Sequence, residues 1–177
     1  MKIDLFYMKD EKKALLDVEA MAARGGEYFL KGYNCSQSVV KAFADVYGLD
    51  DRYLCLASSF GGGMARMRMT CGACSGMFML AGLQSGSPVA NDLASRKANY
   101  AVVQRLGKAF QEENGSMLCS ELLGLRTGTI EPPTPAVRDA EYYRSRPCKR
   151  VIESACAIYA KYYNEVMSGG DDECGNQ

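Results

Sequence analysis

The centre of the chain reads Cys71-Gly72-Ala73-Cys74-Ser75-Gly76, and an apolar run at helical spacing follows it. Thr70 is a good N-cap residue, so this stretch predicts a helix that starts at Thr70 and ends near Ser85-Gly86. In such a helix Cys71 lies in the first turn and Cys74 lies one turn later on the same face. The stretch therefore predicts a central helix that begins with a pair of thiols.

The chain contains no histidine. The commonest general base, the commonest metal ligand and the usual partner of a nucleophilic cysteine are therefore absent. Cysteines are the leading candidates for chemistry, and the eight of them stand at positions 35, 55, 71, 74, 119, 148, 156 and 174. Eight are too few for a disulfide-dense secreted scaffold of this length, so we expect thiols or metal thiolates in a reducing compartment.

Length and charge restrict the class of protein. A chain of 177 residues is long enough for one compact domain with its own core. The 21 basic and 21 acidic residues balance, and no basic run occurs, which argues against nucleic acid or an anionic membrane as partner. The N-terminal residues contain neither a signal-peptide core nor a membrane-length apolar span, so we expect a soluble, cytoplasmic protein. We expect a single helical domain over residues 1–166 and a disordered tail over residues 167–177, which includes Cys174.

Apolar residues recur at helical spacing, without sustained strand alternation. We therefore expect an all-α, single-domain bundle of about five to six helices, with cysteines at helix N-termini. The longer helices are expected over residues 11–30, 34–47, 70–85, 91–113 and 145–166, and shorter ones over 50–58 and 119–123. The Gly25-Gly26 pair is a point at which the first helix can split, Gly61-Gly62-Gly63 predicts a loop, and residues 124–135 predict a long surface loop.

Each of Cys35, Cys71, Cys119 and Cys148 falls in the first turn of an expected helix. Unpaired N–H groups and the helix dipole favour a thiolate there. These positions favour reactive or metal-bound sulfur over inert packing. Basic residues near two of the thiols are expected to lower the thiol pKa further: Arg66 and Arg68 precede Cys71, while Arg144, Arg146, Lys149 and Arg150 surround Cys148.

The remaining patterns support weaker hypotheses. We expect Cys55 and Cys156, on apolar helical faces, to be packing residues. Cys71 and Cys74 have the spacing of a dithiol couple, but the strand that precedes a thioredoxin-type site is missing. A zinc ribbon needs a second close ligand pair, although four dispersed thiolates could still hold zinc or an iron-sulfur cluster. Methionines 64, 67 and 69 would suit copper(I), but buried gap-filling is the preferred interpretation, and the triple glycine lacks the remainder of a phosphate-binding loop.

Five ordered motifs resemble one protein family, the C_GCAxxG_C_C family, whose name describes redox activity. The resemblance covers about Tyr33 to Tyr162 and is more specific than a lone C-x-x-C. The motifs are Tyr33-Asn34-Cys35-Ser36-Gln37-Ser38-Val39, Phe60-Gly61-Gly62-Gly63-Met64, Cys71-Gly72-Ala73 with Gly76, Cys119-Ser120-Glu121-Leu122-Leu123-Gly124, and Pro147-Cys148.

The resemblance implies a small helical protein with four characteristic cysteines, matched here by Cys35, Cys71, Cys119 and Cys148. Cys74 occupies a variable position of the family motif, so it is at most an auxiliary resolving thiol. A related domain in split-Soret cytochromes makes iron-sulfur binding conceivable, but this chain lacks the C-x-x-C-H of haem attachment. Gly72, Ala73 and Gly76 are expected to shape the helix start and to line any cofactor there.

Three functions remain open at this point. The first is a thiol-based redox protein, a possible oxidoreductase, in which Cys71 is the principal nucleophile, Cys35, Cys119 or Cys148 resolves or relays, and an unidentified redox protein is the partner. The second is a module that binds a metal or an iron-sulfur cluster through the same four thiolates. The third is a helical interaction protein, such as a homodimer, whose cysteines only pack.

Overall fold

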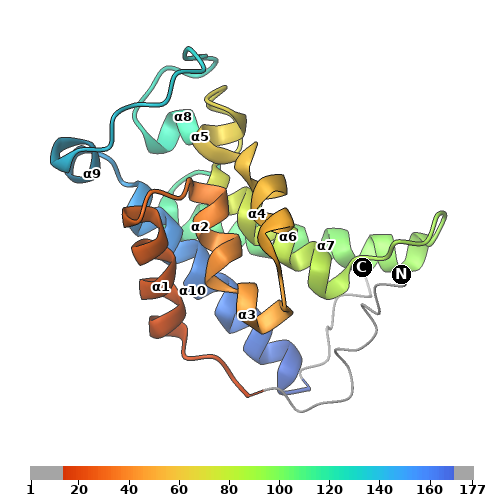
Figure 1. Cartoon of the computed structure of the whole chain (residues 1–177). Coiled ribbons are helices and arrows are strands. Elements are labelled where there is room, and N and C mark those ends of the chain that lie inside the picture. Colours follow the sequence, from red (N-terminus) through yellow and green to blue (C-terminus); the bar gives the residue numbers. More distant parts are fainter. Residues whose placement is uncertain (1–13, 170–177) are drawn as a thin grey trace.

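The structure is a computed structural model that describes residues 14–169, and all regular structure in that range is helical (Figure 1). The expected all-α class is confirmed, with more helical segments than the five to six expected. Within residues 14–169 the only β-type pairing is a single antiparallel bridge between Thr70 and Leu118. The helices are α1 (Val18–Leu30), α2 (Cys35–Ala42), α3 (Ala44–Tyr47), α4 (Asp51–Ser58), α5 (Gly61–Met64), α6 (Gly72–Ser85), α7 (Leu93–Asn114), α8 (Cys119–Leu122), α9 (Ala140–Ser145) and α10 (Cys148–Met167).

Helix α6 is the buried centre of the bundle. All of its residues from position 72 to 77 are buried, and Leu80 and Ala81 extend the buried stretch. Helices α2 and α7 pack on α6, while α1 and α10 lie side by side and α10 also touches α2, α6 and α7 (Figure 1). The apolar run after the central motif is therefore the core helix that the sequence predicts.

Helix α1 is continuous through Gly25-Gly26, so the expected split does not occur. The pair instead lies where α1 packs against α10. A Cβ at Gly25 would be 2.5 Å from Cys156 Sγ, and one at Gly26 would be 2.4 Å from a carboxylate oxygen of Glu153. The missing side chains allow the two helices to approach closely, and this packing offsets the low helix propensity of glycine. The helix starts at its cap Asp17, later than expected, and positions 11–13 lie outside the described residues.

The expected helix over residues 34–47 is interrupted at Phe43, which separates α2 from α3. Its predicted N-cap is confirmed: Asn34 Oδ1 accepts from the Gln37 amide at 3.0 Å, and Gln37 Oε1 accepts from the Asn34 amide at 3.2 Å. The ring of Phe43 is fully buried with its centroid 4.9 Å from that of Tyr159. Burial of this ring coincides with the break, where the backbone of Phe43 is not helical.

Three further boundaries differ from the expected ones. Cys71, not Thr70, is the N-cap of α6, because Thr70 pairs with Leu118 in the β-bridge. Helix α9 falls in a segment for which the sequence predicts no helix, and Asp139 caps it by accepting from the Tyr142 amide at 2.8 Å. Helix α10 starts at Cys148 and reaches Met167, which the sequence assigns to the tail; Cys174 lies outside the described residues.

No helix within residues 14–169 combines the length and the hydropathy that crossing a membrane requires.

The Gly25 contact gives a stability prediction with a matched control. Gly25→Ala places a methyl group 2.5 Å from Cys156 Sγ and should destabilise the protein by about 1–3 kcal/mol through overpacking. Gly82→Ala in α6 meets no atom within 4 Å and should stabilise it by about 0.5–1 kcal/mol through helix propensity. Urea unfolding of both variants measures the difference. Equal stabilities would contradict the packing role of Gly25.

Candidate functional site

The structure brings the four helix-start cysteines to one end of the bundle. Cys35 and Cys148 are the first residues of α2 and α10, Cys71 is the cap of α6, and Cys119 begins α8. These helix starts lie near one another in the upper half of Figure 1. Each of the four thiols is within electrostatic range of the other three. Residues that stand far apart in the sequence therefore form a single sulfur cluster.

Backbone contacts bring Cys71 and Cys119 together. The Cys71 amide donates to the carbonyl of Met117 at 2.8 Å, and the Cys119 amide donates to the carbonyl of Met69 at 2.7 Å. These bonds flank the Thr70–Leu118 bridge, so the segment before α6 and the segment before α8 form a short antiparallel pair. The positions of both thiols follow from this pairing.

Glycines of the central motif bring Cys35 to the same place. A Cβ at Gly72 would be 2.7 Å from the carbonyl oxygen of Phe60 and 3.1 Å from Cys35 Cβ, and one at Gly76 would be 2.8 Å from the carbonyl oxygen of Ser36. Ala73 between them is fully buried. In this structure the three residues pack α6 against its neighbours, and their expected contact with a cofactor stays a prediction.

Cys35 and Cys148 interact directly within the cluster. The two thiols hydrogen-bond each other, which raises the pKa of Cys35 well above its ordinary value and lowers the pKa of Cys148. Cys148 is therefore the thiol of the pair that ionises more readily, and Cys35 is the one that retains its proton more strongly. Both residues are half-buried, and the other reactive candidates are less accessible. The pKa of Cys148 shifts in the direction expected for a helix-start thiol, but its largest cause is the hydrogen bond from Cys35, and nearby Arg146 contributes less.

The same expectation is wrong for the other three helix-start thiols. Burial raises the pKa of Cys71 and also that of Cys119, and the raised pKa of Cys35 is set first by Cys148. At Cys71 the nearby Ala73 and Cys74 amides oppose burial without overcoming it. Desolvation of an anion therefore outweighs the helix-start amides at these positions.

The other cysteines divide between core and surface. Cys74 is fully buried, and burial raises its pKa, so the Cys71/Cys74 pair consists of two protonated thiols. Cys156 is fully buried against Gly25, as expected for a packing residue. Cys55 is exposed, so the expectation that it packs in the core is wrong. Its helix, α4, buries Leu54 and Ala57 instead.

Arg66 and Arg68 are expected to lower the pKa of Cys71, but in the structure they bind other residues. Arg68 donates from Nη1 to Cys119 Sγ at 3.6 Å and forms an ion pair with Glu131 through Nη2. Arg66 pairs with Glu131 at 3.4 Å and donates from Nε to the carbonyl of Pro132 at 2.7 Å. Glu131 lies in the loop before α9, and nothing in the local sequence marks it as a partner of these arginines.

This arginine loop has an unusual backbone. Met64, Ala65, Arg66 and Arg68 have φ values of 57°, 51°, 69° and 59°, and Gly62 and Gly63 before them are also left-handed. Left-handed backbone costs about 1–2 kcal/mol for each residue that has a Cβ, so it persists only where other contacts hold it. The Glu131 ion pairs supply those contacts. Gly63 permits a further one, because a Cβ there would be 2.5 Å from Cys119 Cβ.

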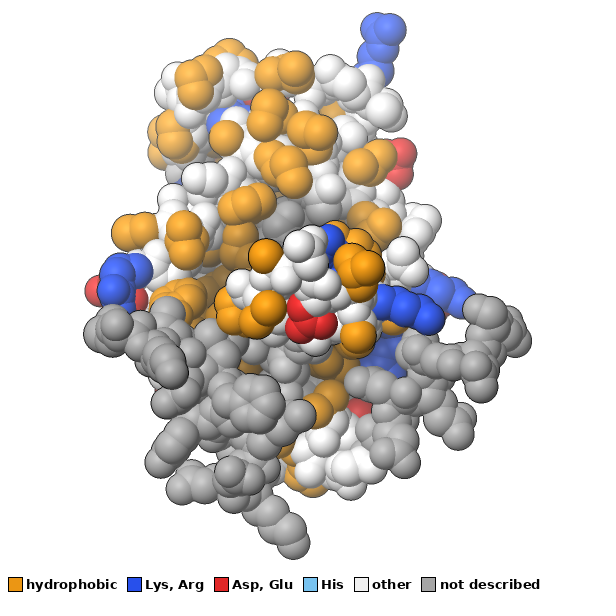
Figure 2. Space-filling view, turned by 90° about the vertical axis from the view of Figure 1, so that its right-hand side faces the viewer, with side chains coloured by type: hydrophobic (Ala, Val, Ile, Leu, Met, Phe, Trp, Pro, Cys, Tyr) orange, Lys and Arg blue, Asp and Glu red, His pale blue; other side chains and the backbone are white. Residues whose placement is uncertain are grey.

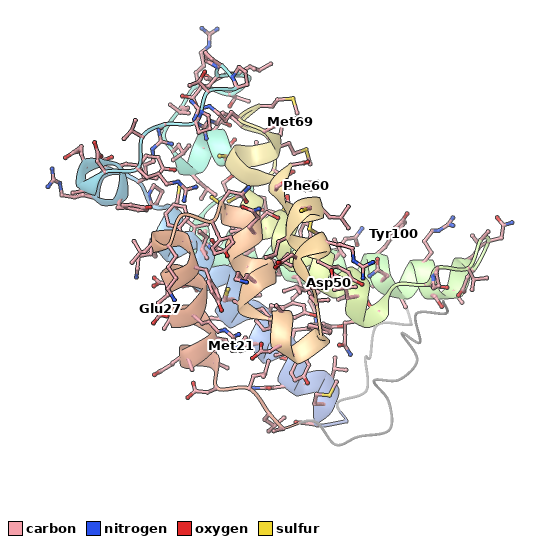
Figure 3. All side chains as sticks on the ribbon, viewed as in Figure 1. Met21, Glu27, Asp50, Phe60, Met69 and Tyr100 are labelled. Carbon is pink, nitrogen blue, oxygen red and sulfur yellow. The ribbon has the colours of Figure 1, made fainter. Side chains whose placement is uncertain are left out.

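The described residues contain no ready-made metal site. Within residues 14–169 no group of three or more Cys, Asp or Glu side chains has an arrangement that could hold a metal ion. The four thiols are close but do not form a ligand set as they stand. Met67 and Met69 are 42% and 50% exposed, so their expected gap-filling role is wrong. Met69 lies at the outer edge of the molecule (Figure 3), toward the face on which hydrophobic side chains are numerous in Figure 2.

Comparison with known proteins adds one finding. A family model described as "Putative redox-active protein (C_GCAxxG_C_C)" matches residues 33–162 of the chain. The match spans all four clustered cysteines and includes Glu131, Arg138 and Tyr142, which the sequence motifs do not single out. No curated protein and no solved structure matches the chain.

The thiol pair predicts a distinctive pH dependence. Cys148 should be alkylated by iodoacetamide below the ordinary cysteine pKa of about 8.5, because its thiolate accepts a hydrogen bond, whereas Cys35 should react only at higher pH. Cys35→Ala removes the donor and should shift the Cys148 profile to higher pH. Peptide-resolved mass spectrometry measures both, with the exposed Cys55 as the reference for an accessible thiol. A Cys148 profile unchanged by Cys35→Ala would contradict the contact.

The close approach at Gly72 predicts a second effect. Gly72→Ala forces a methyl group toward Cys35 Cβ, so it should destabilise the protein by about 1–3 kcal/mol and shift the Cys148 alkylation profile to higher pH. Gly82→Ala on the same helix is the control and should leave that profile in place. Urea unfolding and alkylation test the two effects separately. If folded Gly72→Ala has the same pH profile of Cys148 alkylation as the unsubstituted protein, the α6–α2 contact does not position Cys35.

Proposed function

The chain belongs to the family described as "Putative redox-active protein (C_GCAxxG_C_C)", and from that premise we propose that it is a thiol-disulfide protein whose working pair is Cys35 and Cys148. The observation that carries the proposal is the hydrogen bond between these two thiols, which raises the pKa of Cys35 and lowers the pKa of Cys148. Thiol-disulfide exchange needs this arrangement, because the thiolate is the attacking species and a second thiol must lie beside it.

The exchange proceeds in two steps that balance. The Cys148 thiolate attacks one sulfur of a disulfide R–S–S–R, forming Cys148–S–S–R and releasing R–S⁻. Cys35 then loses its proton to solvent and attacks the Cys148 sulfur, forming the Cys35–Cys148 disulfide and releasing a second R–S⁻. The protein dithiol loses two electrons and the external disulfide gains them. A reductant protein, the expected redox partner, restores the dithiol by the reverse exchange.

Cys148, and not Cys71 as the sequence suggests, is the nucleophile in this exchange. Cys71 is 6% exposed and its pKa is raised by burial, so it is a poor first attacker in the resting protein. Its place within electrostatic range of Cys35 and Cys119 suits a later role, in which it relays a disulfide away from the oxidised pair. Cys119 and Cys74 are assigned no step, and a cytoplasmic location stays a prediction.

Thiol mapping after mild oxidation tests the working pair. The reduced full chain is treated with a limiting amount of a small disulfide, quenched with acid, alkylated and digested. We expect a loss of two protons located in a single Cys35–Cys148 cross-link, because these thiols touch and are accessible. Cys148→Ser should abolish the cross-link, and Cys55→Ser, at an exposed site on α4, should leave it intact.

A cross-link between Cys71 and Cys74 or between Cys71 and Cys119 as the first product would contradict this assignment. A chain in which all four clustered cysteines stay unpaired would contradict the redox function itself.

A further inference from the structure

We propose that the Cys35–Cys148 pair reacts with small disulfides that carry carboxylate groups, and that Arg138 and Arg146 bind those carboxylates. This inference rests on the proposed function and names its substrate class. It comes from the basic side chains that surround the pair, which neither the motifs nor the family description assigns.

Arg138 and Arg146 both lie against one aromatic ring beside the thiols. The guanidinium of Arg146 is 4.7 Å from the ring centroid of Tyr142, and that of Arg138 is 5.8 Å from it. Tyr142 is itself within electrostatic range of both Cys35 and Cys148. The two arginines and the ring therefore border the working pair on the side of α9.

Each arginine is also attached to the chain close to one of the thiols. Arg138 donates from Nη1 to the carbonyl of Tyr33 at 2.8 Å, two positions before Cys35. Arg146 stands two positions before Cys148 at the entry to α10. Both arginines are half-buried, so their guanidinium groups are held in place and still reach solvent. Fixed cations at the edge of an accessible thiol pair can position an anionic substrate.

The charge around the pair is not neutralised by the protein. Arg138 and Arg146 form no ion pair with any residue in the described range, and Arg66 and Arg68 share the single carboxylate of Glu131. Other nearby acids have partners of their own: Asp139 caps α9 and Glu141 pairs with Arg144, while Glu153 pairs with Lys149. In addition, the buried Nε of Arg68 has no hydrogen-bond partner. The site therefore has an excess of positive charge.

Carboxylates are the groups that such a site recognises best. A guanidinium binds a carboxylate through two parallel hydrogen bonds, and partial burial strengthens the attraction relative to water. A disulfide with one carboxylate on each arm places a negative charge near each arginine while its sulfur meets Cys148. The exchange then follows the two balanced steps given above, with two carboxylated thiolates as products. A positively charged disulfide would be repelled from the same site.

Competition among three disulfides of different charge tests the proposal. The reduced full chain is mixed at about pH 7 with 3,3′-dithiodipropionate, with neutral bis(2-hydroxyethyl) disulfide or with cationic cystamine, and formation of the Cys35–Cys148 cross-link is followed by mass. Each rate is divided by the rate of the same probe with dithiothreitol, which removes differences in leaving-group chemistry. We expect the normalised rate of the anionic probe to exceed that of the cationic one by about tenfold or more at low salt, and added salt at about 0.5 M to compress the ratio.

Variants assign the preference to the arginines. Arg146→Gln should reduce the anionic-to-cationic ratio several-fold, and Arg96→Gln, an exposed arginine on α7, should leave it unchanged. The ratio is the informative readout, because a change in the Cys148 pKa alters the rates of all three probes together. Equal normalised rates, or a ratio unchanged by Arg146→Gln, would overturn this inference while leaving the redox pair standing. Absence of the cross-link with every probe would overturn the proposed function and this inference with it.

Discussion

The close crossing of α6 and α2 is the contact on which the site depends. Gly72 and Gly76 have no side chain where α6 meets the start of α2, and any Cβ at either position would collide with backbone oxygen. The approach places the first residue of α2, Cys35, beside the first turn of α6. Since α10 also packs on α2 and α6, its own first residue, Cys148, reaches the same point. A packing requirement of the core thereby brings the two thiols into contact.

Burial and hydrogen bonding, more than the helix dipole, then decide which sulfur is ionised. Cys71 and Cys119 also stand at helix starts, but both are buried and both have raised pKa values. Desolvation of a thiolate can shift its pKa by several units, whereas helix-start effects are typically about 1 kcal/mol. The pKa of Cys148 is lowered instead, because Cys35 donates a hydrogen bond to it. Cys148 is therefore the clustered thiol whose pKa is lowered, whereas both thiols of the C-x-x-C, Cys71 and Cys74, have raised pKa values.

Much of the fold could be predicted from the sequence, because local signals determine it. Asn34 with Gln37, Asp50 before α4 and the apolar run after Cys74 each mark an element that the structure contains. The sequence could also predict that the helix-start cysteines matter. It could not predict which thiols touch, or that Arg68 turns to Cys119 and Glu131, since these contacts join segments many residues apart. The sequence places Cys55 in the core wrongly, because its neighbours on both sides are apolar although only Leu54 is buried and Leu56 is exposed.

A redox titration tests the central claim most directly. The full chain is equilibrated in thiol-disulfide buffers over a range of potentials, quenched with acid, and its cysteines are mapped at each potential. The account predicts one reversible two-electron transition that converts Cys35 and Cys148 from thiols to a disulfide, while Cys71 and Cys119 stay thiols on both sides of the midpoint. A transition carried by Cys71 with Cys74 or Cys119, or no reversible transition at any potential, would contradict it.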